Sequence, residues 1–137
     1  MKRERIRQVI LGLVGLSFIA LIYFLWSDLW HASWLVQQNN NECEPMFLSF
    51  FVVLGLFLLL AVKTPAAHRS LIAFAGWWSL FHATVMAIQT LQAWNRGIHR
   101  QYADVVIAGI VGGVLLAITP TAREAAAHRE SAATVAP

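Results

Sequence analysis

The chain has 137 residues, of which 58% are hydrophobic and only 12% are charged. Soluble domains are usually about 45–50% apolar and about 25% charged, and a small globule needs the most polar surface for its volume. This composition argues against a soluble monomer, a disordered chain and a nucleic-acid-binding module. The single cysteine, Cys43, excludes an intrachain disulfide and a structural zinc site built from several thiolates.

Four apolar segments come close to the length that crosses a bilayer, whose hydrocarbon core of about 30 Å needs roughly 20 helical residues. They cover residues 8–26, 46–62, 71–94 and 103–119. The first two segments contain almost no polar residues, whereas a core helix of a soluble protein would show a polar face at helical period. The sequence therefore predicts an all-α integral membrane protein, with a four-helix bundle in residues 1–119 and a cytoplasmic tail in residues 120–137.

The N-terminal segment starts with basic residues and continues into an uncharged apolar stretch, residues 8–26. This stretch is longer than the apolar core of a signal peptide, about 7–15 residues, and no clear cleavage site follows it. We therefore expect an uncleaved membrane anchor.

Three tryptophans, Trp26, Trp30 and Trp34, recur every four residues at the end of this segment. This spacing places them on one helical face. An indole ring is apolar but carries a polar N–H, so it favours the head-group layer of a membrane. We expect these residues to be interfacial anchors, and an aromatic platform for a ligand is the alternative.

Lysine and arginine residues are distributed unequally along the chain. Eight of the ten lie in the N-terminal segment, the loop 63–70 and the tail, and the other two are Arg96 and Arg100. An excess of these residues marks the cytoplasmic side of a membrane protein. Both termini are therefore predicted to be cytoplasmic, and the net charge of +3 reports orientation and predicts no nucleic-acid partner.

The third segment contains the one ionisable residue that falls deep within a predicted span, His82. At 100° per residue, Trp78, Met86 and Gln89 share a stripe with His82, and Ser79 lies at its shoulder. Lipid cannot hydrogen-bond an imidazole or an amide, so we expect this stripe to face protein.

Two interpretations of His82 and Gln89 remain open. They can form interhelical hydrogen bonds, each worth about 0.6–2 kcal/mol. They can also bind a membrane-soluble redox ligand, such as quinone or haem, because intramembrane ionisable residues are often functional. The other three segments contain no histidine, so a haem held by two histidines within one chain is not expected, whereas a haem shared by two copies remains open.

Residue types that bind copper or zinc occur in the predicted outer loops: His31, Glu42, Cys43, Glu44, His99 and Asp104. No close spacing such as H-x-x-x-H or C-x-x-C joins them, so no metal site is predicted, and His31, Cys43 and His99 are the strongest of these weak candidates. Because no nucleophile–base pattern or phosphate-binding loop occurs either, catalysis is not the favoured function.

The fourth segment contains Gly109 and Gly113, a spacing that lets two helix backbones approach closely. Gly12 and Gly15 of the first segment could form the surface against which this face packs. The pattern is equally compatible with packing inside one chain and with oligomerisation. The alanine-rich tail is expected to form a short, frayed cytoplasmic surface helix followed by a disordered end.

Residues 54–92 resemble a family of small bacterial four-helix membrane proteins of unknown function. The resemblance rests on an LG-x-FLLLA helix, a basic turn with a proline, an HRSLI entry and an S-x-x-H-A-x-x-M-x-x-Q stretch, carried here by Leu54, Gly55, residues 57–61, Pro65, residues 68–72, Ser79, His82, Ala83, Met86 and Gln89. It implies a four-helix membrane fold and places His82 and Gln89 in the family's motif, and it implies no activity.

Small size, the absence of a catalytic pattern and the packing glycines favour an accessory subunit or assembly partner of a larger membrane complex. The alternative is a binding protein for quinone or haem that uses His82 and Gln89. The expected partners are the lipid bilayer of the bacterial inner membrane and either a larger membrane protein or a second copy of the chain. No cofactor follows from the sequence.

Overall fold

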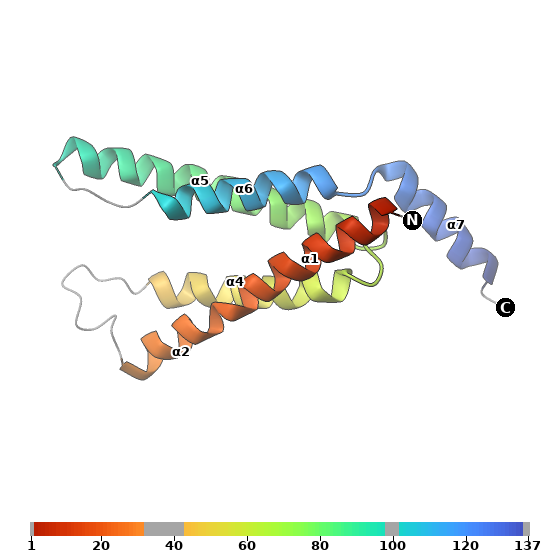
Figure 1. The fold of residues 1–137 in the computed structure, drawn as a ribbon, viewed down its shortest axis with the longest axis horizontal. Helices are drawn as coiled ribbons and strands as arrows, with labels where there is room; N and C mark the ends of the chain where they lie inside the picture. The colour runs from red at the N-terminus through yellow and green to blue at the C-terminus, as the bar shows by residue number, and fades with distance from the viewer. Residues whose placement is uncertain (1, 32–42, 98–101, 136–137) are drawn as a thin grey trace. The chain divides into compact units, whose positions relative to one another are not determined.

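The structure is a computed structural model that describes residues 2–31, 43–97 and 102–135. All regular elements in these ranges are helices (Figure 1): α1 (Lys2–Ala20), α2 (Ile22–His31), α4 (Cys43–Ala61), α5 (Arg69–Asn95), α6 (Ala103–Ile118) and α7 (Ala122–Val135). The predicted all-α class is therefore confirmed for these ranges. The chain divides into two compact units, Met1–Thr64 and Pro65–Pro137, and each is described by itself.

Two helical stretches are long and apolar enough to cross a membrane: Lys2–Ser27, which combines α1 with the first part of α2, and Arg69–Asn95, which is α5. A third candidate is the bent pair Ala103–Ile118 and Ala122–His128, whose two parts meet at 55°. The apolar part of α4, Met46–Ala61, is shorter. The prediction of membrane-spanning helices is thus supported for the first and third segments, and for the fourth only when the bent pair counts as one span.

The first unit is an antiparallel pair of helices, α1 and α4, that approach closely where two glycines meet. A Cβ atom placed on Gly55 would lie 2.8 Å from the Gly15 carbonyl oxygen and 2.8 Å from Cβ of Phe18. Beside this contact, the rings of Phe18 and Phe51 pack edge to face with centroids 5.1 Å apart. The buried residues of α1 recur every three or four positions along this face: Arg7, Leu11, Gly15 and Phe18.

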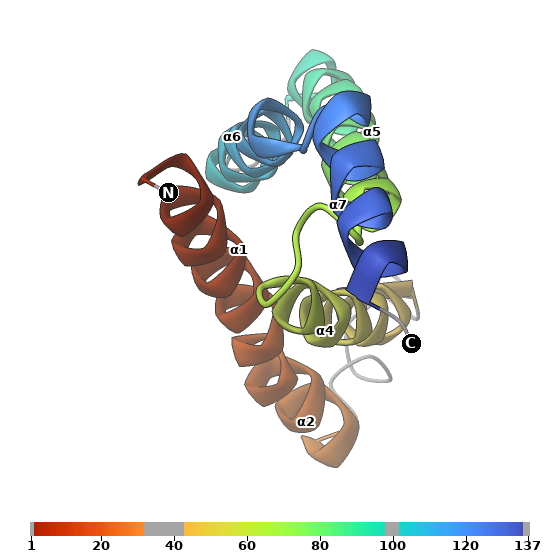
Figure 2. The same cartoon turned by 90° about the vertical axis from the view of Figure 1, so that its right-hand side faces the viewer.

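The second unit contains an antiparallel pair made of α5 and α6, which lie side by side in both views (Figures 1 and 2). They approach closely at Gly76 and Gly112, where a Cβ on Gly112 would lie 2.9 Å from the Gly76 carbonyl oxygen. The face of α5 that is buried consists almost entirely of small residues: Ile72, Ala75, Gly76, Ser79, Ala83 and Thr90. Small side chains let the two backbones approach, and the pair is held by van der Waals contact.

One end of this second unit is organised by two prolines and an arginine. Pro65 and Pro120 are fully buried. Arg69, the first residue of α5, donates a hydrogen bond from Nε to the Pro120 carbonyl oxygen at 2.7 Å. This bond ties the start of α5 to the segment between α6 and α7.

The ends of the helices follow local chemistry. At the end of α5, Gly97 adopts φ 75, and its N–H bonds to the Trp94 carbonyl oxygen at 2.9 Å; glycine carries no steric penalty in this left-handed conformation. α7 begins with a capping box: Thr121 N–H donates to the Glu124 carboxylate at 2.8 Å, and Glu124 N–H donates to the Thr121 hydroxyl at 3.3 Å.

Candidate functional site

The polar stripe of α5 lies at the edge of the buried face. Trp78, His82 and Met86 are half-buried, and Gln89 is exposed. Ser79, in contrast, is only 2% exposed. At 3.6 residues per turn, His82 lies about 60° around the helix from Ser79. α6 therefore covers the small residues near Ser79, and the stripe that contains His82 borders this contact.

Three hydroxyl groups of α5 are hydrogen-bonded within the helix itself. Ser79 donates to the Ala75 carbonyl oxygen at 2.9 Å, Thr84 to that of Leu80 at 2.8 Å, and Thr90 to that of Met86 at 2.9 Å. Such bonds to the preceding turn let a hydroxyl reside in an apolar surrounding without a partner on another helix. Ser79 therefore contributes a small packing surface, and its hydroxyl already has an acceptor.

Trp78 packs along its own helix. Its ring lies 6.3 Å from that of Phe74, at an interplanar angle of 26°. The indole thus covers the turn of α5 that precedes His82. His82 and Trp78 are four residues apart on one helix and so lie on the same side of it.

The four predicted packing glycines have different surroundings. Gly15 lies in the contact between α1 and α4, where a Cβ would meet the Leu59 side chain at 2.9 Å. A Cβ on Gly109 would lie 4.0 Å from Cβ of Ala83, which is an ordinary van der Waals contact. A Cβ on Gly12 or Gly113 would meet no atom of the described residues within 4 Å.

The tightest positions include three glycines outside the predicted set: Gly55, Gly76 and Gly112. Gly112 lies beside the predicted Gly113. Gly55 and Gly76 stand alone in their segments, so no small-residue spacing marks them. The only available signal was the presence of a glycine within an apolar segment, because glycine is an unfavourable helix former unless close packing requires it.

The predicted interfacial tryptophans lie partly within the described ranges. Trp26 and Trp30 are 64% and 73% exposed. Their rings stack with centroids 5.6 Å apart and an interplanar angle of 18°. They thus share one face of α2, while Trp34 lies outside the described residues.

The structure describes only some of the residues that were considered as metal ligands. His99 and Glu42 lie outside the described residues, and the structure does not describe the side chains of His31 and Cys43. Across residues 2–31, 43–97 and 102–135, no group of three or more histidine, cysteine, aspartate or glutamate side chains could hold a metal ion.

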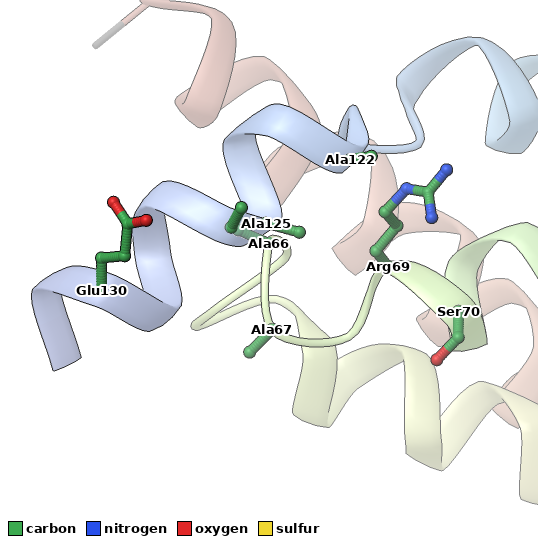
Figure 3. A pocket seen from close by; sticks show the side chains of 8 residues that line it. Ala66, Ala67, Arg69, Ser70, Ala122, Ala125 and Glu130 are labelled. Carbon is green, nitrogen blue, oxygen red and sulfur yellow. The ribbon is translucent and has the colours of Figure 1, made fainter. Parts of the chain in front are cut away.

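A hollow of about 440 Å³, which the sequence analysis did not predict, opens beside the start of α5; Figure 3 shows the residues that line it. It is lined by Ala66, Ala67, Arg69, Ser70, Ala122, Ala125, Ala126 and Glu130. These residues come from the turn before α5, the first turn of α5, and α7. Sequence analysis missed it because these segments are about 50 residues apart in the chain and several of the residues are plain alanines.

Comparison with known proteins gives one result about identity. No curated protein and no solved structure matches the chain. The model of a family described as a family of unknown function (DUF6632) matches residues 2–134. The expectation that the chain falls in an uncharacterised family is thereby confirmed. Since the match covers almost the whole sequence, the chain belongs to the family of unknown function DUF6632.

Proposed function

We propose that this chain is a small multi-pass protein of the bacterial inner membrane that serves as an accessory subunit or assembly partner of a larger membrane complex. The observation that carries the proposal is Gln89, whose side chain is exposed although it lies on the long apolar helix α5. α5 runs from Arg69 to Asn95, so Gln89 is about two turns from its centre. If α5 spans the bilayer, the amide lies within the hydrocarbon layer.

An amide at that depth finds no water to hydrogen-bond. α6 already packs against the small-residue face of α5, and this leaves Gln89 uncovered within the second unit. Polar residues in membrane helices usually face other protein segments, where side-chain hydrogen bonds hold helices together. The stripe of His82 and Gln89 is therefore the surface of α5 that fits a partner helix.

The apolar exposure of the helices supports a membrane environment. Large aliphatic and aromatic side chains on α1, α4 and α5 are at least half exposed: Leu13, Leu16, Leu56, Phe57, Leu60, Phe74, Trp77, Phe81, Val85, Ile88 and Leu91. Soluble monomers seldom expose apolar patches larger than a few hundred Å². In a bilayer the same side chains contact lipid tails at no cost.

The length of α6 gives further support for a partner. With 16 residues, α6 measures about 24 Å, which is less than the roughly 30 Å of a hydrocarbon core. A short span is accommodated by local thinning of the bilayer or by association with other helices. The short length of α6 and the polar stripe of α5 therefore both favour lateral association with another helix.

The proposed orientation has both termini in the cytoplasm, with four segments crossing the membrane. Within each unit the two long helices are antiparallel, so the start of α1 and the end of α4 lie at one end, as do the start of α5 and the end of α6. The basic residues Lys2, Lys63, Arg69 and Arg123 belong to these ends. An excess of lysine and arginine marks the cytoplasmic side, and this supports the proposed orientation.

The test is purification of the chain in mild detergent followed by native mass spectrometry. We expect a stoichiometric complex with a membrane-protein partner or a second copy, and we expect Gln89→Leu to reduce the bound fraction several-fold. Thr84→Val is the matched control: Thr84 is also exposed on α5, but its hydroxyl already bonds to the Leu80 carbonyl oxygen. A wild-type chain that is always recovered alone, or an unchanged complex in Gln89→Leu, contradicts the proposal.

A second candidate function is binding of a quinone or haem. The observation in its favour is that the imidazole of His82 is half-buried next to the half-buried indole of Trp78, on the border of the α5–α6 contact. The purified protein would then carry a visible absorbance or an extractable quinone, which His82→Ala would abolish. Unchanged ligand content with a lower melting temperature in His82→Ala would assign His82 to helix packing.

A further inference from the structure

The last helix, α7, carries two opposite charges on one exposed face. Arg123 and Glu130 are seven residues apart, so they lie within about 20° of each other around the helix axis. Ala126 and Ala127 stand between them, one on each side of the line that joins the two charges, and all four residues are exposed. We call these four residues the charged face of α7. It has a positive end near the start of the helix, a negative end two turns later, and only methyl groups in between.

Neither charge of this face is paired along its own helix. Oppositely charged side chains pair on a helix when they are three or four residues apart, and the residues at those distances from Arg123 and Glu130 are all uncharged. The Glu130 carboxylate also points away from Arg69 (Figure 3). Both ends of the charged face can therefore pair with groups of another molecule.

A second copy of the charged face is its own complement. When another α7 lies against it in the opposite direction, Arg123 comes next to the partner's Glu130, and Glu130 comes next to the partner's Arg123. The same two helices side by side in parallel would place each charge next to its own kind. The alanines at the centre let the two backbones approach closely. The charge pattern thus favours an antiparallel pair related by a two-fold axis.

The bend between α6 and α7 suits the same arrangement. α7 leaves the direction of α6 at 55° (Figure 1). Under the function proposed above, on which this step rests, α6 crosses the membrane and α7 lies on its cytoplasmic side. A two-fold axis along the membrane normal relates two copies inserted the same way, and it reverses only the part of a helix direction that lies in the membrane plane. With α6 near the normal, most of α7 lies in that plane, so it meets its copy antiparallel.

We propose that the charged face of α7 is the docking surface for a second copy of this chain. The two α7 helices pack antiparallel on the cytoplasmic side, with Ala126 and Ala127 beside the two-fold axis and one ion pair between Arg123 and Glu130 on each side of it. Exposed ion pairs are individually weak. Both copies are confined to one membrane in one orientation, and this raises their effective concentration so that a small contact suffices.

Disulfide cross-linking in native membranes tests the geometry, in the full-length chain with Cys43→Ser as background. Ala126→Cys places a thiol beside the two-fold axis, so oxidation with copper phenanthroline should give a covalent dimer. Thr134→Cys is the matched control on the same side of α7. It lies about 11 Å from the axis along the helix, so its two copies are about 22 Å apart and should stay unlinked. Equal linking at both positions would indicate a parallel pair and overturns the proposal.

Charge reversal tests the pairing. Arg123→Glu leaves only acidic charges on the face, and Glu130→Arg leaves only basic ones. Either change should reduce the cross-linking of Ala126→Cys about tenfold, because two attractions become two repulsions. When both variants are expressed together, each supplies the charge that the other lacks, so cross-linking between them should return. This rescue separates lost pairing from lost folding.

His128→Glu is the matched control for charge reversal. It adds a negative charge to an exposed position on the opposite side of α7, so it should leave the cross-link at Ala126→Cys unchanged.

The proposal is overturned if Ala126→Cys forms no dimer, if it links only to a different protein, or if joint expression of the reversed variants gives no rescue. These results are distinguishable from failure of the proposed function. A chain that still co-purifies with a larger membrane protein, and loses it in Gln89→Leu, retains the proposed function and lacks only the contact between α7 helices. A chain recovered folded from detergent-free buffer loses both.

Discussion

At the scale of single residues, the neighbouring glycines Gly112 and Gly113 of α6 occupy opposite environments. A Cβ on Gly112 would lie 2.9 Å from the Gly76 carbonyl oxygen and 2.9 Å from the Leu80 backbone nitrogen. Backbone atoms cannot move aside as a flexible side chain can, so Gly112→Ala must push α5 and α6 apart. We expect it to lower the free energy of unfolding by about 1–3 kcal/mol.

Gly113→Ala is the matched control, because it introduces the same methyl group into open space. It should leave stability unchanged or raise it by up to about 1 kcal/mol, since alanine favours a helix more than glycine does. The two variants are compared by thermal or SDS unfolding in detergent. Equal stability of the two would show that the close approach of α5 and α6 at Gly112 does not exist.

The same residues show where sequence reasoning ends. The four-residue spacing of Gly109 and Gly113 indicates that a helix carries a small-residue face, and the structure places Gly112 in close contact with α5. A spacing along one helix carries no information about the rotation of its neighbour. Which glycine meets Gly76 depends on that rotation, and it is set by the packing of both helices together.

At the scale of elements, the structure of α7 depends on its first turn. The capping box joins Thr121 and Glu124 through two backbone N–H groups. Thr121→Ala removes the side-chain oxygen that accepts from the Glu124 N–H, and this should destabilise α7 by about 0.5–2 kcal/mol. Hydrogen–deuterium exchange should show faster exchange in the first turns of α7 and unchanged exchange in α5.

Thr134→Ala is the control for this element, since the Thr134 hydroxyl bonds only to the Glu130 carbonyl oxygen one turn earlier. It should leave the start of α7 protected as in the wild type. Unchanged exchange in Thr121→Ala would mean that α7 does not depend on its cap. The sequence predicted a short surface helix in the tail, and the structure extends it over Ala122–Val135 because alanine has the highest helix propensity.

At the scale of the whole molecule, the distribution of basic residues predicts how the chain crosses the membrane. The native Cys43 should react with a membrane-impermeant maleimide when only the outer membrane of the cells has been permeabilised. In the double variant Cys43→Ser and Thr64→Cys, labelling should require disruption of the inner membrane, because residue 64 belongs to the basic connection between α4 and α5. Labelling of both cysteines from the same side would contradict the proposed four-span topology.

The sequence by itself determined the helical class, the apolar character of the long segments, and membership of an uncharacterised family. These properties follow from composition and local periodicity, which each segment carries independently of the others. The tertiary structure decided the rest: the contacts Gly15–Gly55 and Gly76–Gly112, the position of His82 beside the packed face and not within it, and the hollow that the start of α5 lines together with α7. Each of these depends on two segments that are distant in the chain, and their relative rotation and approach are set by side-chain packing that a pattern within one segment does not contain.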